Sequence, residues 1–238
     1  MKKTKTILSL QDANFRVFGH RGIMGVHDEN TMDSFVAAKA AGFAGIEYDL
    51  QKTRDGKPVI IHDGKVDRTT NGKGWVKELL WKKIRTMRTE HGYTIPTFEE
   101  VLALSSHGFV QNIELKSRGS SDIAVKILKE GFAKKILDPE NFIVSSFHHR
   151  DLVNFKKHIK NVRIGALIAH WPADGIAFAK KIGAWSINVD IDIVNEDPSI
   201  VEETHKAGLK IGVWTIRSYD DAKRMKDLGV DFIFSNFP

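Results

Sequence analysis

Two short apolar segments of this sequence carry carboxylates at positions where a buried strand is normally apolar. In the segment 46–50, Glu47 and Asp49 alternate with three apolar residues. Side chains of a strand point alternately to opposite faces, so the two carboxylates share one face and the apolar residues share the other. Two buried carboxylates side by side repel each other unless a cation lies between them. We therefore predict that Glu47 and Asp49 are ligands of a metal ion.

A second segment, residues 113–116, repeats this pattern. Its sequence Ile-Glu-Leu-Lys places Glu114 and Lys116 on one face by the same alternation. Three carboxylates in a chain without cysteine favour a hard divalent cation, Mg²⁺ or Ca²⁺, and the sequence does not distinguish these two ions. The alternative is that the carboxylates form ion pairs with Lys116 or Arg21 inside the fold, without a metal ion.

Two histidines and an arginine could complete a catalytic site. His20 and Arg21 lie between two glycines directly after the apolar segment 15–18, and His62 follows the apolar run 59–61. Histidine has a pKa near neutrality, so His20 and His62 could supply the base and the acid that a hydrolysis needs. The planar guanidinium of Arg21 could bind a phosphate through two hydrogen bonds. Alternatively, His62 only hydrogen-bonds its neighbours at the end of a strand.

An aromatic residue, Trp214, closes the apolar segment 210–214. An aromatic side chain at the end of a strand can cover a bound substrate or cap the core, and the sequence leaves both roles open. We include Trp214 among the candidate substrate-binding residues. Ser145 and Ser146 lack the flanking glycines that accompany a nucleophilic serine, so we assign them no such role.

The elements that must position these residues alternate between strands and helices. Each parallel strand needs a crossover helix, and closing eight strands removes both edges of the sheet. We therefore predict an α/β fold, a TIM-type (β/α)8 barrel, with residues 1–238 as a single catalytic domain. A doubly wound open sheet is the alternative. The predicted strands are residues 15–18, 45–50, 110–115, 142–145, 163–168, 185–189, 210–214 and 231–234. The predicted helices are residues 31–41, 97–105, 122–130, 149–158, 174–181, 198–206 and 219–228.

One stretch, residues 51–95, interrupts this alternation. It contains an extra strand, residues 58–62, which faces the second strand across the turn-forming pair Asp55-Gly56. An insertion after the carboxyl end of a strand would overhang the face where barrel enzymes have their active sites. We predict that residues 51–95 form a small insertion subdomain within the barrel domain.

Composition and charge limit the partners of the chain. The formal net charge is +6, which suits a phosphate-bearing substrate, and the basic residues are scattered without a stacking motif, so we expect no nucleic-acid partner. No uncharged apolar stretch approaches the roughly 20 residues that span a bilayer. The apolar residues Ile7, Leu8 and Leu10 are too few for a secretory signal. We therefore expect a cytoplasmic protein without stable membrane association, and the oligomeric state stays open.

Nine segments of the sequence resemble the glycerophosphodiester phosphodiesterase family, and they follow the family's order over almost the whole chain. The family's barrel, with an insertion after its second strand, agrees with the prediction from periodicity. The nine segments are residues 20–22, 29–35, 46–49, 53–56, 62–70, 95–97, 112–116, 145–147 and 213–215.

The resemblance implies a function in lipid and glycerol metabolism. It implies that a divalent metal ion supports hydrolysis of glycerophosphodiesters, such as glycerophosphocholine or glycerophosphoethanolamine, to sn-glycerol 3-phosphate and an alcohol. The implied mechanism begins with attack by the glycerol hydroxyl next to the phosphate, and water then opens the cyclic phosphate. The resemblance implies His20 and His62 as the acid–base pair, Glu47, Asp49 and Glu114 as metal ligands, and Arg21 and Lys116 as phosphate contacts.

Three features depart from the family pattern. Asp28 stands where the family usually has proline, Arg217 stands where asparagine is common, and Asn236 lies in a C-terminal segment that replaces a threonine–aspartate pair. Their effect on activity stays open, as does the preferred headgroup. Two alternative functions remain: a lysophospholipase D-type phosphodiesterase acting on lysophospholipids, and a non-catalytic module that binds phosphodiesters.

Overall fold

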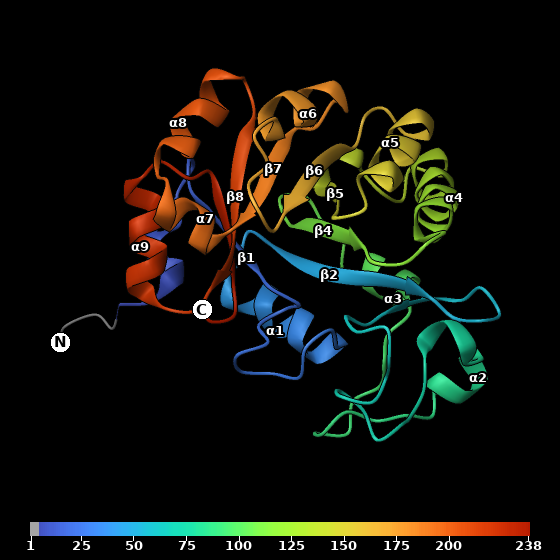
Figure 1. The fold of residues 1–238 in the computed structure, drawn as a ribbon. Helices are drawn as coiled ribbons and strands as arrows, with labels where there is room; N and C mark the ends of the chain where they lie inside the picture. The colour runs from blue at the N-terminus through green and yellow to red at the C-terminus, as the bar shows by residue number, and fades with distance from the viewer. Residues whose placement is uncertain (1–4) are drawn as a thin grey trace.

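A barrel of parallel strands forms the centre of the molecule in the computed structural model, which describes residues 5–238 (Figure 1). Within these residues, eight parallel strands pair in the order β1-β9-β8-β7-β6-β5-β4-β2, and β2 pairs with β1 to close the ring. The predicted (β/α)8 barrel is confirmed, and the alternative of an open sheet is wrong. The strands are β1 (Arg16–Gly19), β2 (Gly45–Lys52), β4 (Val110–Leu115), β5 (Phe142–Ser146), β6 (Arg163–Ile168), β7 (Ser186–Asp190), β8 (Lys210–Ile216) and β9 (Phe232–Ser235).

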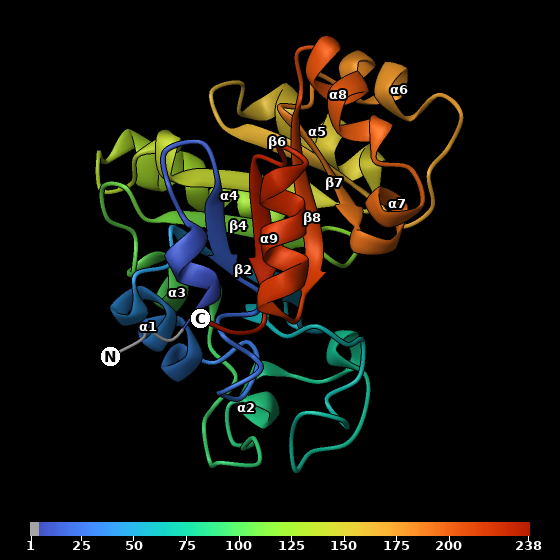
Figure 2. The same cartoon turned by 90° about the vertical axis from the view of Figure 1, so that its left-hand side faces the viewer.

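Helices surround the barrel, as Figures 1 and 2 show. All seven predicted helices are present, and two short ones, α2 and α7, were not predicted because four and six residues are too few to show a helical period. The α-helices are α1 (Met32–Ala41), α2 (Trp81–Ile84), α3 (Phe98–Leu102), α4 (Ser120–Ala133), α5 (His149–His158), α6 (Gly175–Lys181), α7 (Ile191–Glu196), α8 (Ser199–Lys206) and α9 (Tyr219–Asp227). Three 3₁₀ helices are η1 (Ile7–Leu10), η2 (Val76–Glu78) and η3 (Pro139–Asn141).

The ends of helix α1 illustrate how the sequence sets the helix boundaries. The Thr31 hydroxyl accepts a hydrogen bond from the Ser34 amide, which satisfies one of the free amides of the first turn. At the other end Gly42 adopts a left-handed conformation with φ of 93°, which glycine reaches without steric cost. The capping hydrogen bond of Thr31 and the left-handed conformation of Gly42 therefore set the two boundaries of α1.

The two faces of the strands pack differently. The outward ring of Tyr48 contacts Phe35 of α1 and Phe98 of α3, with ring centroids 5.7 and 6.3 Å apart. A separate cluster, which includes Phe18 and Phe232, fills part of the barrel interior. Apolar side chains thus occupy the outer face and part of the interior, and polar side chains remain at the carboxyl ends of the strands.

The insertion lies beyond one end of the barrel and contains α2 (Figure 2). Strand β3 (Pro58–Ile60) runs antiparallel to β2, as predicted, but it ends two residues before the predicted boundary. The turn includes Gly56 at φ of +83°, which glycine adopts most readily. A small hydrophobic cluster belongs to the insertion and its border and is separate from the barrel core. The description of residues 51–95 as a subdomain stays a prediction.

The 3₁₀ helix η1 packs against the barrel. Ile7 of η1 is buried in the main core, and its backbone amide donates to the carbonyl of Pro238 over 3.3 Å. Among residues 5–238, no helix has both the length and the apolar character needed to cross a membrane. Cytoplasmic localisation stays a prediction, since residues 1–4 of the segment on which it depends lie outside the described residues.

Candidate active site

The three predicted metal ligands converge at the carboxyl ends of two neighbouring strands. Asp49 of β2 lies opposite Glu114 of β4 in the parallel register, and Glu47 precedes Asp49 on the same face. One carboxylate oxygen from each residue lies within 4.8 Å of the others, and all three side chains are buried. Such a set of hard oxygen donors fits a divalent cation.

Electrostatics in this cluster also favour a cation. Burial, together with the charges of Asp49 and Glu114, raises the pKa of Glu47 well above its usual value. Burial and the charge of Asp49 raise the pKa of Glu114 to about 7. Burial alone would raise the pKa of Asp49, but Lys116 and Arg21 outweigh it and lower that pKa. Among residues 5–238, Asp49 Oδ1 has no hydrogen-bond partner although it is buried. The raised pKa values show that the carboxylates repel one another, and a bound cation would relieve this repulsion.

The two candidate phosphate ligands border the carboxylates. Lys116 Nζ lies 2.9 Å from Glu114 Oε1, and Arg21 Nε lies 3.5 Å from Asp49 Oδ2. The backbone amide of Arg21 donates to Glu47 Oε2 over 3.0 Å. The ion pairs that the sequence offered as an alternative to a metal ion therefore exist, and they include a 3.7 Å contact between Lys116 Nζ and Asp49 Oδ1. Two cations nevertheless face three carboxylates, and within residues 5–238 Asp49 Oδ1 has no hydrogen bond.

The two histidines are held in defined orientations. His20 Nδ1 lies 2.8 Å from Asn236 Oδ1, an acceptor, so Nδ1 carries the proton. Within the described residues 5–238, Nε2 has no hydrogen-bond partner and is free. His62 Nε2 lies 3.1 Å from Lys116 Nζ, which only donates, while His62 Nδ1 lies 2.7 Å from an Asp63 oxygen. Burial, followed by the nearby charge of Arg21, lowers the pKa of His20 to about 4. His20 is therefore a neutral imidazole at neutral pH.

A single cavity of about 90 Å³ unites these side chains. Trp214 lies at its wall, where the indole nitrogen donates to the carbonyl of Asn188 and the ring packs edge-on against Phe147 at 5.6 Å. Trp214 thus both borders the cavity and packs against a neighbour, so each of its two predicted roles remains compatible with the structure. Six of the candidate residues line this cavity together with Glu47: His20, Arg21, His62, Glu114, Lys116 and Trp214.

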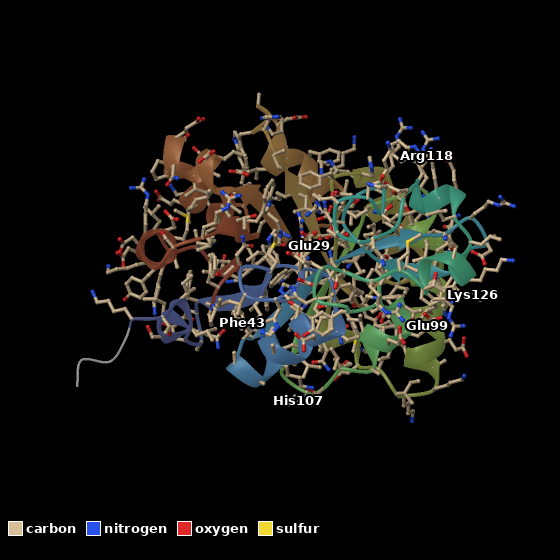
Figure 3. The ribbon with its side chains drawn as sticks, turned by 90° about the horizontal axis from the view of Figure 1, so that it is seen from below. Glu29, Phe43, Glu99, His107, Arg118 and Lys126 are labelled. Carbon is tan, nitrogen blue, oxygen red and sulfur yellow. The ribbon has the colours of Figure 1, made fainter. Side chains whose placement is uncertain are left out.

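Glu29 connects the site to the insertion, a role that sequence analysis missed. Its carboxylate contacts Arg21 Nη1 at 2.9 Å and Arg68 Nη1 at 2.7 Å. Figure 3 shows Glu29 near the centre of the view, where the loop before α1 meets the insertion. Asn30, the next residue, donates to Asp49 Oδ2 over 2.8 Å. Both residues belong to a segment of the family resemblance, which was the available signal.

The sequence departures have defined surroundings. Asn236 orients His20, as described above. Asp28 accepts hydrogen bonds from the backbone amide and the ring of His91 over 3.1 and 2.6 Å, so it ties the loop before α1 to the insertion. Arg217 is exposed.

Gln51 positions the segment that carries His62. The alternation that placed Glu47 and Asp49 inward continues to Gln51, a signal that sequence analysis did not use. Its side-chain nitrogen lies 2.9, 2.9 and 2.7 Å from the carbonyl oxygens of Ile61, His62 and Asp63. One buried amide thus holds three consecutive peptide groups.

Replacing Gln51 with alanine is expected to lower the free energy of unfolding by about 1–3 kcal/mol, because buried carbonyls lose their donor. We also expect kcat for phosphodiester hydrolysis to fall about tenfold, because His62, which the sequence predicts as an acid or base, is no longer held in place. Gln111→Ala is the matched control, since Gln111 is equally buried and hydrogen-bonded but faces Tyr48 and α3. Equal loss of kcat in both variants, measured beside thermal unfolding, would contradict the positioning role.

A known protein family matches almost the whole chain. The model of the glycerophosphoryl diester phosphodiesterase family covers residues 20–238, a range that includes every candidate site residue. The chain belongs to this family. Membership in the glycerophosphodiester phosphodiesterases confirms the resemblance seen in the sequence and the prediction that the chain is an enzyme, a phosphoric diester hydrolase.

Two relatives and one solved structure support this membership. The chain is 33% identical to a glycerophosphodiester phosphodiesterase of Bacillus altitudinis, with 94% of this chain and 95% of the relative covered. It is 35% identical to one of Caldanaerobacter subterraneus subsp. tengcongensis, with 93% and 94% covered. An Oleispira antarctica phosphodiesterase, solved in complex with the product sn-glycerol-3-phosphate, superposes with a TM-score of 0.86 at 26% identity and covers 98% of this chain and 96% of that one.

Proposed function

We propose that this protein is a divalent-metal-dependent phosphodiesterase that hydrolyses small glycerophosphodiesters to sn-glycerol 3-phosphate and an alcohol. The observation that carries this proposal is the cavity lined by two cationic side chains, two histidines and the carboxylates of Glu47 and Glu114. The third carboxylate, Asp49, does not line the cavity but lies within 4.8 Å of the other two. The product bound to the Oleispira relative supports the substrate class.

The side chains divide the chemistry among them. Glu47, Asp49 and Glu114 would hold the metal ion, which when bound neutralises negative charge on the phosphoryl group. Arg21 and Lys116 donate to phosphate oxygens and stabilise the charge that develops there. Hydrolysis also needs a base for the attacking oxygen and an acid for the leaving alcohol. We assign these proton transfers to His20, whose Nε2 is free, and to His62, whose ring contacts Lys116.

Release of sn-glycerol 3-phosphate from glycerophosphocholine tests the function directly. The purified protein is treated with a chelator and then supplied with Mg²⁺ or Ca²⁺. We expect the chelator to abolish release and one of the ions to restore it. No release with either ion would contradict the proposed substrate, and release undiminished by the chelator would contradict metal dependence.

Affinity for the metal ion is expected to depend on pH. Because burial and Asp49 raise the pKa of Glu114 to about 7, this carboxyl is largely protonated at pH 6 and ionised at pH 8. A metal ion has to displace that proton at the lower pH, so the apparent affinity should be about tenfold weaker at pH 6 than at pH 8. The raised pKa of Glu47 acts in the same direction. Calorimetric titration of chelator-treated protein measures this, and equal affinity at both pH values would contradict the ligand assignment.

A further inference from the structure

The excess of positive over negative charge lies in the insertion. Residues 51–95 contain 11 of the 36 lysines and arginines but only 5 of the 30 aspartates and glutamates, so the remaining residues contain 25 of each. The insertion therefore accounts for the whole net charge of +6, and the rest of the chain is balanced. The basic residues are therefore distributed along the whole chain, but of these two parts only the insertion has more basic than acidic residues.

Most of this charge is exposed and not neutralised within the protein. Arg68, Lys73 and Lys57 of the insertion form ion pairs with carboxylates. Within residues 5–238, seven exposed basic side chains of the insertion form no ion pair. They are Arg54, Lys65, Lys77, Lys82, Lys83, Arg85 and Arg88.

An exposed tryptophan lies among these cations. The Trp75 side chain is 44% exposed, and the ammonium groups of Lys65 and Lys77 lie 5.0 and 5.5 Å from its ring centroid. Residues Lys65 and Trp75 pair through an antiparallel bridge, which holds the ring beside Gly64. A large aromatic ring is thus kept at the surface between two positive charges.

Exposed apolar side chains gather at the same end of the barrel. Seven large apolar side chains are exposed among residues 5–238, and five of them lie in segments that follow the carboxyl ends of strands, where the active site also opens. Only Val36 and Ile136 lie elsewhere. The five are Val26, Trp75, Tyr93, Phe147 and Phe237.

We propose that this end of the molecule, including the insertion around Trp75, docks reversibly on an anionic lipid surface. Basic side chains near such a surface are attracted to its negative potential, and tryptophan and tyrosine favour the boundary between water and lipid. A nucleic acid would use the cations but not the exposed apolar side chains in the segments that follow the strands. Attraction of this kind is weakened by salt, which distinguishes it from the stable association that the sequence argued against.

Docking in this orientation would place the active site against the surface. Lys65 follows His62 by three residues, and Gly64 packs against Trp75, so the surface begins beside a candidate catalytic residue. A soluble product of lipid breakdown would then diffuse only a short distance from the surface to the cavity. The class of reaction that supplies such a substrate is the removal of acyl chains from a glycerophospholipid.

Vesicle binding by the full chain tests the proposal, and it does not depend on the proposed catalytic activity. The protein is sedimented with vesicles of phosphatidylcholine and phosphatidylglycerol in equal amounts, and with vesicles of phosphatidylcholine alone. We expect binding to the anionic vesicles only, and release in 0.5 M NaCl because charges are then strongly screened. Absence of binding to the anionic vesicles at low salt would overturn the proposal.

Two double variants with the same net charge distinguish a local docking surface from a general effect of the protein's net charge. Lys65→Glu combined with Lys77→Glu should weaken partition to anionic vesicles about tenfold or more. Lys160→Glu combined with Lys181→Glu changes the net charge equally at the amino ends of β6 and β7, and partition should stay within about twofold. Equal weakening by both pairs would overturn the proposal. A thermal unfolding temperature within a few degrees of that of the unaltered protein shows that the variants are folded.

A variant of Trp75 distinguishes a lipid surface from other polyanions as the partner. Trp75→Ala keeps the charge, and we expect it to weaken vesicle binding several-fold because an interfacial ring is lost. A double-stranded oligonucleotide is the competitor. Competition at equal charge concentration, together with undiminished vesicle binding by Trp75→Ala, would show a general polyanion surface and overturn the lipid assignment.

Discussion

Replacing Glu47 with glutamine is expected to lower kcat/KM for glycerophosphocholine by about a thousandfold or more. The substitution keeps the shape of the side chain and an oxygen that can accept from the Arg21 amide, but it removes one of the three charges that would hold the metal ion. Metal-assisted stabilisation of a phosphoryl transition state contributes several kcal/mol, which corresponds to a loss of this size. Steady-state kinetics at saturating Mg²⁺ or Ca²⁺ measure the effect, and calorimetry should show a parallel loss of metal affinity.

The stability of this variant distinguishes a catalytic defect from a folding defect. Glu47 is buried beside two other carboxylates, so its charge opposes folding when no cation is bound. Chelator-treated Glu47→Gln should therefore unfold at the same temperature as the unaltered protein or at a higher one. Glu99→Gln is the matched control, because Glu99 is exposed on α3 (Figure 3). Its one ion pair within residues 5–238 is with Lys57. Activity of Glu47→Gln within tenfold of the control would contradict the metal-ligand assignment.

Replacing His20 with alanine is expected to lower kcat by about a hundredfold to ten-thousandfold, the range of a general acid or base. Nε2 of His20 is free, and burial keeps the ring neutral at neutral pH, so the imidazole is ready to accept a proton. Metal affinity should be unchanged, because His20 is not among the carboxylate ligands. Added imidazole should restore part of the activity, because it can enter the space that the side chain leaves.

A histidine outside the site provides the control for this prediction. His107 lies in the connection between α3 and β4, away from Glu29 in Figure 3, and it does not line the cavity. His107→Ala should retain full activity. A tenfold or smaller loss of kcat in His20→Ala, or the absence of imidazole rescue in a variant with intact metal binding, would speak against proton transfer by His20.

The sequence by itself determined the strand–helix alternation and the facing of the charged residues. Alternation at a period of two predicted that Glu47 and Asp49 share one face, and the same rule predicted Glu114 beside Lys116. These predictions succeeded because strand geometry is local: which face a side chain occupies depends only on its position along its own strand. The hairpin between β2 and β3 was also predicted, since its Asp-Gly turn lies within a few residues.

Only the tertiary structure decided which of these residues meet. Asp49 lies opposite Glu114 because β2 and β4 pair in one particular register, and no local pattern specifies that register across 65 residues of chain. Asn236 orients His20 over a separation of 216 residues, because the last strand closes the barrel against the first. Glu29 and Gln51 acquire their roles from contacts with the insertion. Local geometry sets the direction of each side chain, whereas closure of the barrel and strand register set its partners.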